Sequence, residues 1–294
     1  EAAAFLSMNK RAFNLSELGT GKSLASLWAY DYLKSIGLLN KCLVISPLST
    51  LERTWADEIF QHFPHLTYTV LHGSKDKRIK LLNEDFDIYI INHDGVGIIE
   101  PHLKDRTDID LVIVDEIAQC ARNAGTTRWR KINIVVNKQK EPRACWGMSG
   151  TPTPNGPTDA WAQCRLVVPD KVPPYFNRFK GTVMKQLSQF QWVAKAGATE
   201  IVRDVMQPSV RFTRDECLDL PPLMYETRQV PLTKEQGKAY KEMLTKLRIQ
   251  AEEGDIIAVN EAVKMGKLVQ IACGVVYASD GTEVTVPATH RVEE

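Results

Sequence analysis

One short stretch, residues 16–23, constrains the fold of this chain more than any other. It reads Ser-Glu-Leu-Gly-Thr-Gly-Lys-Ser and precedes a run of helix-forming residues. Gly19 and Gly21 allow the backbone to turn tightly and to present bare N–H groups, and the following helix adds the positive end of its dipole. Lys22 can reach the β- and γ-phosphates of a nucleotide, and the Ser23 hydroxyl can hold magnesium. The stretch therefore predicts a phosphate loop.

The expected ligand of this loop is a nucleoside triphosphate, ATP, together with magnesium. We assign Lys22 both to binding and to catalysis. The strict pattern asks for glycine where this chain has Ser16, a position at which small residues are tolerated. The alternative interpretation is a glycine-rich turn that only opens a helix. The expected nucleotide-binding residues are Leu18, Gly19, Thr20, Gly21, Lys22 and Ser23.

From the loop to about residue 168, strand-like and helix-like segments alternate. Such alternation predicts an α/β fold with a mainly parallel sheet covered on both faces, whose ligands bind at the carboxyl ends of the strands. Apolar runs typical of buried parallel strands lie at 42–46, 68–71, 87–92 and 111–115, and a less typical one at 144–149. Helical patterns lie at 24–39, 50–62 and 75–82, the second with Trp55, Ile59 and Phe63 on one face.

The character of the chain changes past Pro169, where loops and prolines become frequent. In the last part we expect a strand over residues 225–230 and a helix over residues 234–252. The chain starts at Glu1 rather than at methionine, and we expect a piece of a longer protein. We therefore predict a nucleotide-binding lobe over 1–168, a helical extension of it over 169–222, and a linker that leads toward a further unit over 223–294.

An acidic pair follows one of the predicted strands, in the run Val112-Ile113-Val114-Asp115-Glu116. Asp115 can bind magnesium through water, and Glu116 can orient or deprotonate the attacking water. By itself a strand that ends in two acids is often only a solvated turn. Behind a phosphate loop, we expect Asp115 to be a magnesium ligand and Glu116 to be catalytic.

A third motif is the run Ser149-Gly150-Thr151-Pro152 after the last predicted strand. Ser149 and Thr151 could form hydrogen bonds with the acidic pair and sense the γ-phosphate. The alternative is a proline- and glycine-containing turn. We assign Ser149, Gly150 and Thr151 to coupling between the nucleotide and the rest of the protein.

The order Gly-Thr-Gly-Lys-Ser, Asp-Glu and Ser-Gly-Thr-Pro resembles the first motor lobe of superfamily-two helicases, and among these the compact, phage-type Swi/Snf DNA translocases. The resemblance covers nearly the whole chain and implies a RecA-like lobe that couples ATP hydrolysis to movement on DNA. Further residues similar to the family's motifs are Ile45-Ser46-Pro47-Leu48 with Trp55 and Glu58, Ile91-Asn92-His93-Asp94, Arg122-Asn123, Arg214 with Leu220-Pro221-Pro222, and Leu232-Thr233 with Gln236 and Tyr240.

The sequence departs from the family at two points. Ala118 stands where many relatives have a histidine that couples the ATP state to the DNA state. No Gln-x-x-Gly-Arg-x-x-Arg motif occurs, so the arginine fingers of a second motor lobe are expected outside this chain. The resemblance then implies that the chain alone is a weak or inactive ATPase. It also implies a place in the cytoplasm of a bacterial or phage-infected host cell.

A basic segment over residues 121–143 is the first candidate for a DNA surface. Its cations would neutralise phosphates, which makes binding dependent on salt and independent of base sequence. The alternative is a solvated charged face of a helix. The expected partner is double-stranded DNA. The residues predicted to contact DNA here are Arg122, Asn123, Arg128, Arg130 and Lys131, and the segment also holds Trp129, Lys138, Lys140 and Arg143.

Further DNA contacts are expected from Pro47, Ser49 and Thr50, whose hydroxyl and backbone groups can bind strand phosphates, and from Asn92. Thr50 could equally cap a helix. A group of aromatic residues is more typical of a helical core than of a base-stacking platform. Its members are Tyr175, Phe176, Phe179, Phe190 and Trp192.

Composition excludes few classes of protein. The net charge of +1 favours no particular partner, so any DNA surface must be a local patch. No apolar run approaches the roughly 18 residues of a membrane span, and no signal peptide is visible. The six cysteines form no CxxC pair, which favours buried free thiols over a zinc or disulfide framework. The six histidines lack metal-ligand spacing, and we assign them no role.

Two other functions compete with a DNA-driven motor. One is a phosphate-loop ATPase or kinase that acts on something other than nucleic acid, against which the Ser-Gly-Thr-Pro motif and the basic segment argue. The other is a catalytically silent DNA-binding scaffold that uses ATP structurally. The presence of Lys22, Ser23, Asp115 and Glu116 argues against the scaffold.

Overall fold

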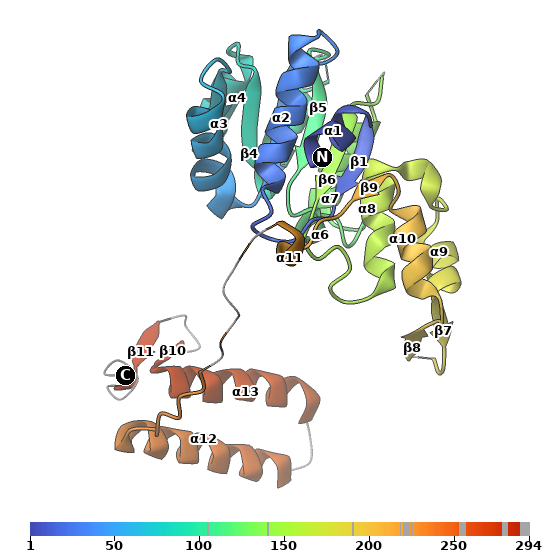
Figure 1. Cartoon of the computed structure of the whole chain (residues 1–294). Coiled ribbons are helices and arrows are strands. Elements are labelled where there is room, and N and C mark those ends of the chain that lie inside the picture. The colour runs from blue at the N-terminus through green and yellow to red at the C-terminus, as the bar shows by residue number, and fades with distance from the viewer. Residues whose placement is uncertain are drawn as a thin grey trace. The chain divides into compact units, whose positions relative to one another are not determined.

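The computed structural model of the chain divides into two compact units, Glu1–Leu220 and Pro221–Glu294 (Figure 1). The structure describes residues 1–104, 106–139, 141–189, 191–217, 219, 224, 226–252, 257–277 and 282–288, with the side chains of 246–264 left aside.

The first unit is built on a seven-stranded sheet in which every pairing is parallel. This confirms the predicted α/β class and all five predicted strands, to within two residues at each end. Central strands such as β2 are buried along nearly their whole length, because helices cover both faces of the sheet. In spatial order the strands are β3 (Tyr68–Val70), β4 (Ile88–Asn92), β2 (Lys41–Ser46), β5 (Ile109–Val114), β6 (Ala144–Met148), β1 (Arg11–Asn14) and β9 (Ser209–Val210).

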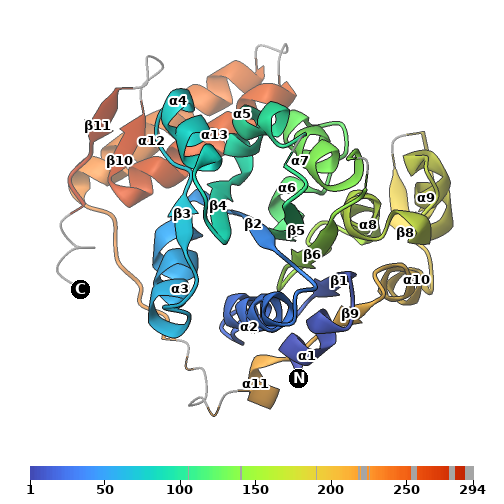
Figure 2. The ribbon, with the colours of Figure 1, turned by 90° about the horizontal axis from the view of Figure 1, so that it is seen from above.

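Two apolar cores lie on the two faces of this sheet. On one face pack α1 (Ala2–Ser7), α2 (Lys22–Ser35) and α3 (Asp57–His62), around a buried cluster that includes Tyr30, Trp55 and Trp146. On the other face, visible on the opposite side of the sheet in Figure 2, pack α4 (Lys75–Asn83), α5 (Val96–Ile99), α6 (Ile117–Cys120), α7 (Thr127–Asn137) and α8 (Ala160–Val167).

The predicted helix over 50–62 is present, but it begins differently. A 3-10 turn over Leu48–Thr50 leads into a π-helical segment over Leu51–Ala56, and α3 follows. The Thr50 hydroxyl does not cap the helix. It donates to the Pro47 carbonyl at 3.0 Å, which closes the turn. Trp55, Ile59 and Phe63 are all buried on one face, as predicted.

Two strands of the sheet, β1 and β9, are absent from the sequence-based prediction. β1 has four residues and mixed polarity, and β9 has two residues. Neither carries a periodic apolar pattern long enough to detect. β1 nevertheless lies between β6 and β9 and leads directly into the phosphate loop.

The rest of the first unit is α9 (Phe176–Val183), a hairpin of β7 (Met184–Gln186) and β8 (Trp192–Ala194), α10 (Ala198–Val205) and α11 (Arg214–Cys217). Of the described members of the aromatic group, only Phe179 is fully buried in the core. Tyr175 and Phe176 are exposed, and the ammonium group of Lys180 lies 3.8 Å from the centroid of the Trp192 ring. Phe190 lies outside the described residues.

The second unit contains two helices, α12 (Lys234–Glu252) and α13 (Ile257–Cys273), and the antiparallel hairpin of β10 (Val275–Tyr277) and β11 (Glu283–Thr285). Helix α12 agrees with the prediction. It begins with a capping box, in which Gln236 accepts from the Thr233 backbone N–H and Thr233 Oγ1 accepts from the Gln236 N–H. The predicted strand over 225–230 is wrong for residues 226–230, which form no regular structure, and Tyr225 lies outside the described residues.

The burial of the cysteines agrees only in part with the prediction of buried free thiols. Cys42, Cys120, Cys145 and Cys164 are buried, whereas Cys217 and Cys273 are exposed. Within the described parts of the chain, no helix combines the length and the apolar character that a membrane span requires.

Candidate functional site

Three motifs meet because the strands that precede them are neighbours. β5, β6 and β1 lie side by side in that order, and all three point the same way. The acidic pair follows β5, the Ser-Gly-Thr turn follows β6, and the phosphate loop follows β1. Their carboxyl ends therefore form one site, at the edge of the sheet where ligands of such folds bind.

The phosphate loop has the backbone geometry that its glycines permit. Gly19 and Gly21 have φ angles of 82° and 75°, in the left-handed region that side chains disfavour, and Gly21 caps α2. The Lys22 ammonium group donates to the Glu17 carbonyl at 2.9 Å, so it lies within the loop's own concavity. Burial lowers the pKa of Lys22, while the carboxylates of Glu116 and Asp115 act in the opposite direction.

The contacts of Ser16 explain why a serine stands where the strict pattern has glycine. Its side chain is buried, and its hydroxyl accepts a hydrogen bond from the Phe212 N–H at 3.1 Å. Its backbone N–H donates to Asn14 Oδ1 at 3.2 Å. Glycine would leave the Phe212 N–H without this acceptor. The serine therefore ties the start of the loop to the segment that follows β9.

Asp115 is buried at the end of β5 and held from two sides. The Trp55 indole Nε1 donates to one carboxylate oxygen at 3.1 Å, and the Glu116 N–H donates to the other at 2.9 Å. Burial raises the pKa of Asp115, and these two hydrogen bonds oppose the rise. A carboxylate oxygen held in place in this way is a ligand that magnesium prefers.

Glu116 adopts a left-handed backbone conformation with φ of 46°, which is unusual for a residue other than glycine. Burial, and then the charge of Asp115, raise the pKa of the Glu116 carboxyl, whereas Lys22 and a hydrogen bond with Ser149 lower it. A carboxylate with a raised pKa, held beside a phosphate loop, is suited to accept a proton from water.

The Ser-Gly-Thr turn touches both of the other motifs. Ser149 is fully buried, and its hydroxyl both interacts with Glu116 and accepts from the Thr151 N–H at 3.3 Å. A β-carbon added at Gly150 would lie 3.4 Å from the Leu18 nitrogen, so the turn packs directly against the loop. Thr151 itself is exposed.

Two residues near the acidic pair were given no catalytic or binding role from the sequence. The His93 ring Nε2 lies 2.9 Å from the Asp115 carbonyl, and burial lowers the pKa of His93. Burial, followed by the charge of Asp115, raises the pKa of Glu58 to about 7. Among the described residues no group donates to Glu58 Oε2, which is buried. His93 and Glu58 are far from Asp115 in the sequence, so no local pattern predicts that they lie near it. The one signal for Glu58 is its position one helical turn after Trp55, which bonds to Asp115.

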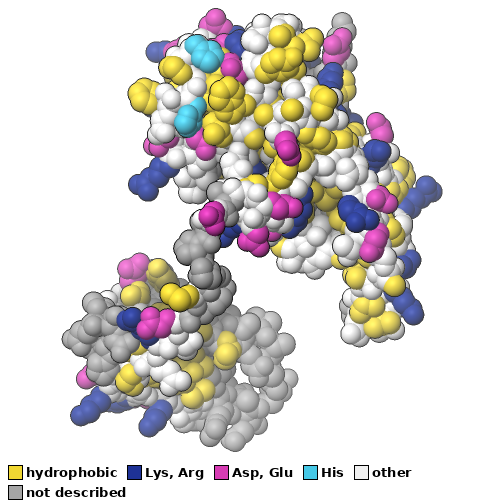
Figure 3. All heavy atoms as spheres, in the orientation of Figure 1, with side chains coloured by type: hydrophobic (Ala, Val, Ile, Leu, Met, Phe, Trp, Pro, Cys, Tyr) yellow, Lys and Arg dark blue, Asp and Glu magenta, His cyan; other side chains and the backbone are white. Residues whose placement is uncertain are grey.

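The residues predicted to bind DNA after the acidic pair fall into two groups. Arg128 and Lys131 form ion pairs with Asp94 and Glu100, at 2.6 and 2.7 Å. Arg122, Asn123 and Arg130 are exposed, and Arg130 donates to the Gly125 carbonyl. On the face that Figure 3 shows, Lys and Arg side chains lie dispersed among Asp and Glu side chains, in agreement with the small net charge.

The second set of predicted DNA contacts lies at the ends of β2 and β4, which are paired in the sheet. Pro47 is half-buried, Ser49 is exposed, and the Thr50 hydroxyl is engaged in the turn. Asn92 Oδ1 accepts a hydrogen bond from Arg78 at 3.0 Å. Of these side chains, that of Ser49 is the most open to a partner.

Arg143 and Trp129 belong to the core rather than to the basic surface. The Trp129 indole donates to the Ala162 carbonyl at 2.8 Å. Arg143 is 6% exposed. Its guanidinium donates to the backbone carbonyls of Leu103, Arg106, Ile109 and Val135, which ties together segments on both sides of β5.

We expect Arg143→Ala to lower the free energy of unfolding by about 3–5 kcal/mol, because it removes the buried hydrogen bonds to four carbonyl groups and leaves the space of the guanidinium group unfilled. Urea denaturation of the full chain measures the effect. Lys138→Ala is the matched control, since this exposed lysine of the same segment should change stability by less than about 0.5 kcal/mol. Equal urea midpoints for the two variants would contradict the assigned role of Arg143.

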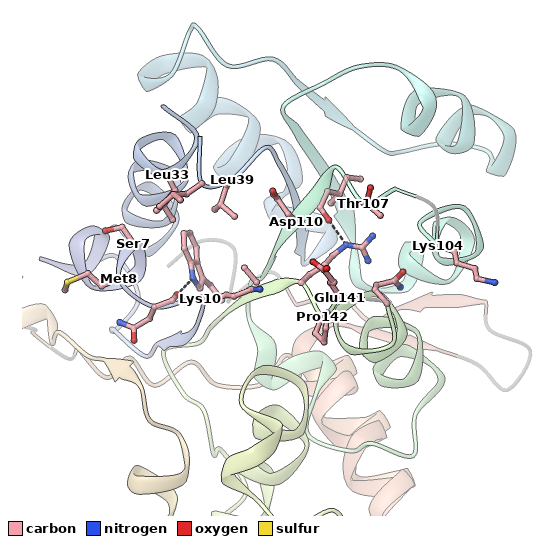
Figure 4. Close-up of a pocket in the computed structure, with 17 residues that line it drawn as sticks. Ser7, Met8, Lys10, Leu33, Leu39, Lys104, Thr107, Asp110, Glu141 and Pro142 are labelled. Carbon is pink, nitrogen blue, oxygen red and sulfur yellow. Dashed lines mark hydrogen bonds between the residues drawn. The ribbon is translucent and has the colours of Figure 1, made fainter. Parts of the chain in front are cut away.

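A cavity of about 590 Å³ lies elsewhere, at the amino ends of the strands (Figure 4). Residues that precede or begin β1, β5 and β6 line it, among them Lys10, Ile109 and Ala144, together with Leu33 of α2. The three motifs leave the opposite ends of these strands. The cavity is therefore separate from the candidate nucleotide site.

Comparison with known proteins agrees with this geometry. The model of the family described as "SNF2-related domain" matches residues 15–272. The chain is 26% identical over 291 residues to "Putative protein p41" of Acyrthosiphon pisum secondary endosymbiont phage 1, covering 94% of this chain and 63% of that relative. It is 27% identical over 263 residues to the Drosophila melanogaster "SWI/SNF-related matrix-associated actin-dependent regulator of chromatin subfamily A containing DEAD/H box 1 homolog", covering 81% of this chain and 30% of the relative.

Among solved structures, "Sulfolobus solfataricus SWI2/SNF2 ATPase core in complex with dsDNA" has a similar fold. The TM-score is 0.57 with 22% sequence identity, over 92% of this chain and 55% of that one. The chain thus spans less than two thirds of each of these proteins. The chain corresponds to the N-terminal lobe of such an ATPase. Because the family model matches most of this chain, the chain belongs to the SNF2-related family of superfamily-two ATPases.

Proposed function

We propose that this chain is the ATP-binding motor lobe of a DNA translocase or helicase. The observation that carries the proposal is the convergence of the phosphate loop, the acidic pair and the Ser-Gly-Thr turn at the carboxyl ends of three adjacent parallel strands. Residues 223–294 then lead toward a second motor lobe. The phage relative supports a role in a bacterial or phage-infected host cell.

The donor set of the site fits ATP with magnesium. The Lys22 ammonium group already lies in the loop, where it donates to the Glu17 carbonyl. A phosphate oxygen can replace this carbonyl as the acceptor. The Ser23 hydroxyl and the Asp115 carboxylate are oxygen ligands of the kind that magnesium prefers. When bound, the metal neutralises charge that develops on the phosphates. Glu116, restrained by its backbone and by Ser149, orients the attacking water and accepts its proton.

DNA is the proposed track of the motor. The Sulfolobus structure with a similar fold was determined as an ATPase core in complex with double-stranded DNA. In this chain the exposed cations Arg122 and Arg130 follow the acidic pair, and Ser49 follows β2. Contacts to phosphates from such groups hold the duplex without reading its sequence. Ser149 and Thr151 link the nucleotide to this surface in the proposed mechanism.

The proposal predicts salt-dependent binding of duplex DNA by the full chain. The logarithm of the association constant should fall linearly with the logarithm of the salt concentration, and Arg122→Ala combined with Arg130→Ala should make this slope shallower by about 2. Filter binding at several salt concentrations measures it. Arg203→Ala, an exposed arginine of α10, should leave the slope unchanged. Absence of salt-sensitive binding would favour an ATPase that acts on a substrate other than nucleic acid.

A further inference from the structure

The segment that follows α10 is fastened to the phosphate loop along its length. We call residues 208–217 the strap. The N–H groups of Phe13, Leu15 and Glu17 donate to the strap carbonyls of Pro208, Val210 and Phe212, at 3.0, 2.8 and 2.9 Å. The parallel pairing of β1 with β9 therefore continues beyond both strands and into the loop itself.

Arg214 ends this ladder at the loop. Its side-chain Nε donates to the Leu18 carbonyl at 2.8 Å, and its backbone N–H donates to Glu17 Oε2 at 3.1 Å. Arg211 reaches the other Glu17 oxygen at 3.4 Å. The strap thus places the Arg214 guanidinium group on the loop backbone. The Glu17 carboxylate of the loop in turn accepts from the Arg214 backbone N–H and from the Arg211 side chain.

Two cationic side chains form hydrogen bonds with adjacent carbonyl groups of the phosphate loop. The Lys22 ammonium group donates to the Glu17 carbonyl, and Arg214 Nε donates to the Leu18 carbonyl. The two charges are close enough that Arg214 contributes to lowering the pKa of Lys22, although burial contributes more. Two cations at one loop repel each other, and a polyanion bound between them relieves the repulsion.

We propose that Arg214 is a second cationic ligand of the nucleotide, supplied by this chain to the terminal phosphate beside Lys22. The inference rests on the proposed ATP-binding function. Lys22 is the residue of such a loop that reaches the β- and γ-phosphates, and Arg214 is anchored at the neighbouring carbonyl. Since Arg214 is anchored through Nε, its terminal nitrogens can donate to a phosphate oxygen while the strap stays in place.

A purely structural role for Arg214 makes a different prediction. If the side chain only fastens the strap, its loss should weaken ATP and ADP binding equally, because both nucleotides need the same loop. A ligand of the terminal phosphate acts on ATP and little on ADP. The comparison of the two nucleotides therefore separates the two roles.

The experiment measures the affinity of the full chain for fluorescent ATP and ADP analogues in the presence of magnesium. We expect Arg214→Gln, which keeps an amide donor for the Leu18 carbonyl but removes the charge, to weaken ATP binding about 10-fold or more and ADP binding less than about 3-fold. Arg214→Lys should recover part of the ATP affinity. Arg203→Ala should change neither affinity.

Equal losses for ATP and ADP, or no loss, in Arg214→Gln would overturn the assignment of Arg214. Melting temperatures of all variants show whether the fold is retained, and Arg214→Met, which also removes the charge, provides the same comparison if the glutamine variant does not fold. Lys22→Ala tests the underlying function separately. If Lys22→Ala binds ATP as tightly as the unchanged chain, the proposed function fails; if it loses ATP while Arg214→Gln keeps it, only the inference about Arg214 fails.

Discussion

Replacing Glu116 by glutamine should lower ATP turnover at least about 100-fold in a protein that joins this lobe to a second motor lobe, and ATP should still bind. The amide has the shape of the carboxylate, so the left-handed backbone at this position and the approach of Ser149 can persist. What is lost is the group that accepts the proton of the attacking water. The measurement is steady-state phosphate release with saturating DNA, together with nucleotide affinity.

The matched control is Glu141→Gln, an exposed glutamate near the end of the basic segment. It should leave both turnover and affinity unchanged. A loss of ATP affinity as large as the loss of turnover in Glu116→Gln would mean that Glu116 acts in binding. Unchanged turnover would remove Glu116 from the catalytic step and favour a catalytically silent scaffold.

The sequence predicts those parts of the site that are local. The φ angles of Gly19 and Gly21, the start of α2 and the acidic pair at the end of β5 all follow from short runs of residues. Strands β2 and β5 are likewise recognisable, because burial on both faces makes them continuously apolar. These features need no information from distant parts of the chain.

What the sequence does not reveal depends on partners far along the chain. β1 is a strand because it pairs with β6 and β9, and β9 is a strand because it pairs with β1, not because of their own composition. Arg143 looks like one more surface cation among its neighbours, yet carbonyls brought together by the fold surround its guanidinium group. The contact of His93 with Asp115 spans neighbouring motifs, and no spacing rule anticipates it.

Residues 1–294 alone should hydrolyse ATP about 10³–10⁵-fold more slowly than a protein that carries both lobes, with or without DNA. Charge in the transition state spreads over the oxygens of the transferred phosphoryl group. In the described part of the chain, Lys22 and the proposed ligand Arg214 are the cations that donate to backbone carbonyls of the phosphate loop. The family resemblance implies that the arginine fingers come from a second lobe, which we expect to close onto this site.

Phosphate release by the purified chain, with and without duplex DNA, measures this rate, and a second lobe added in trans should raise it. The result separates two roles for Arg214, that of an arginine finger and that of a ligand of the terminal phosphate. If Arg214 did the work of an arginine finger, the chain alone would turn over briskly and DNA would accelerate it, and the need for a second lobe would be refuted. If Arg214 only binds the terminal phosphate, the chain holds ATP tightly and hydrolyses it slowly, because the charge that stabilises the transition state must arrive with the closure of the second lobe.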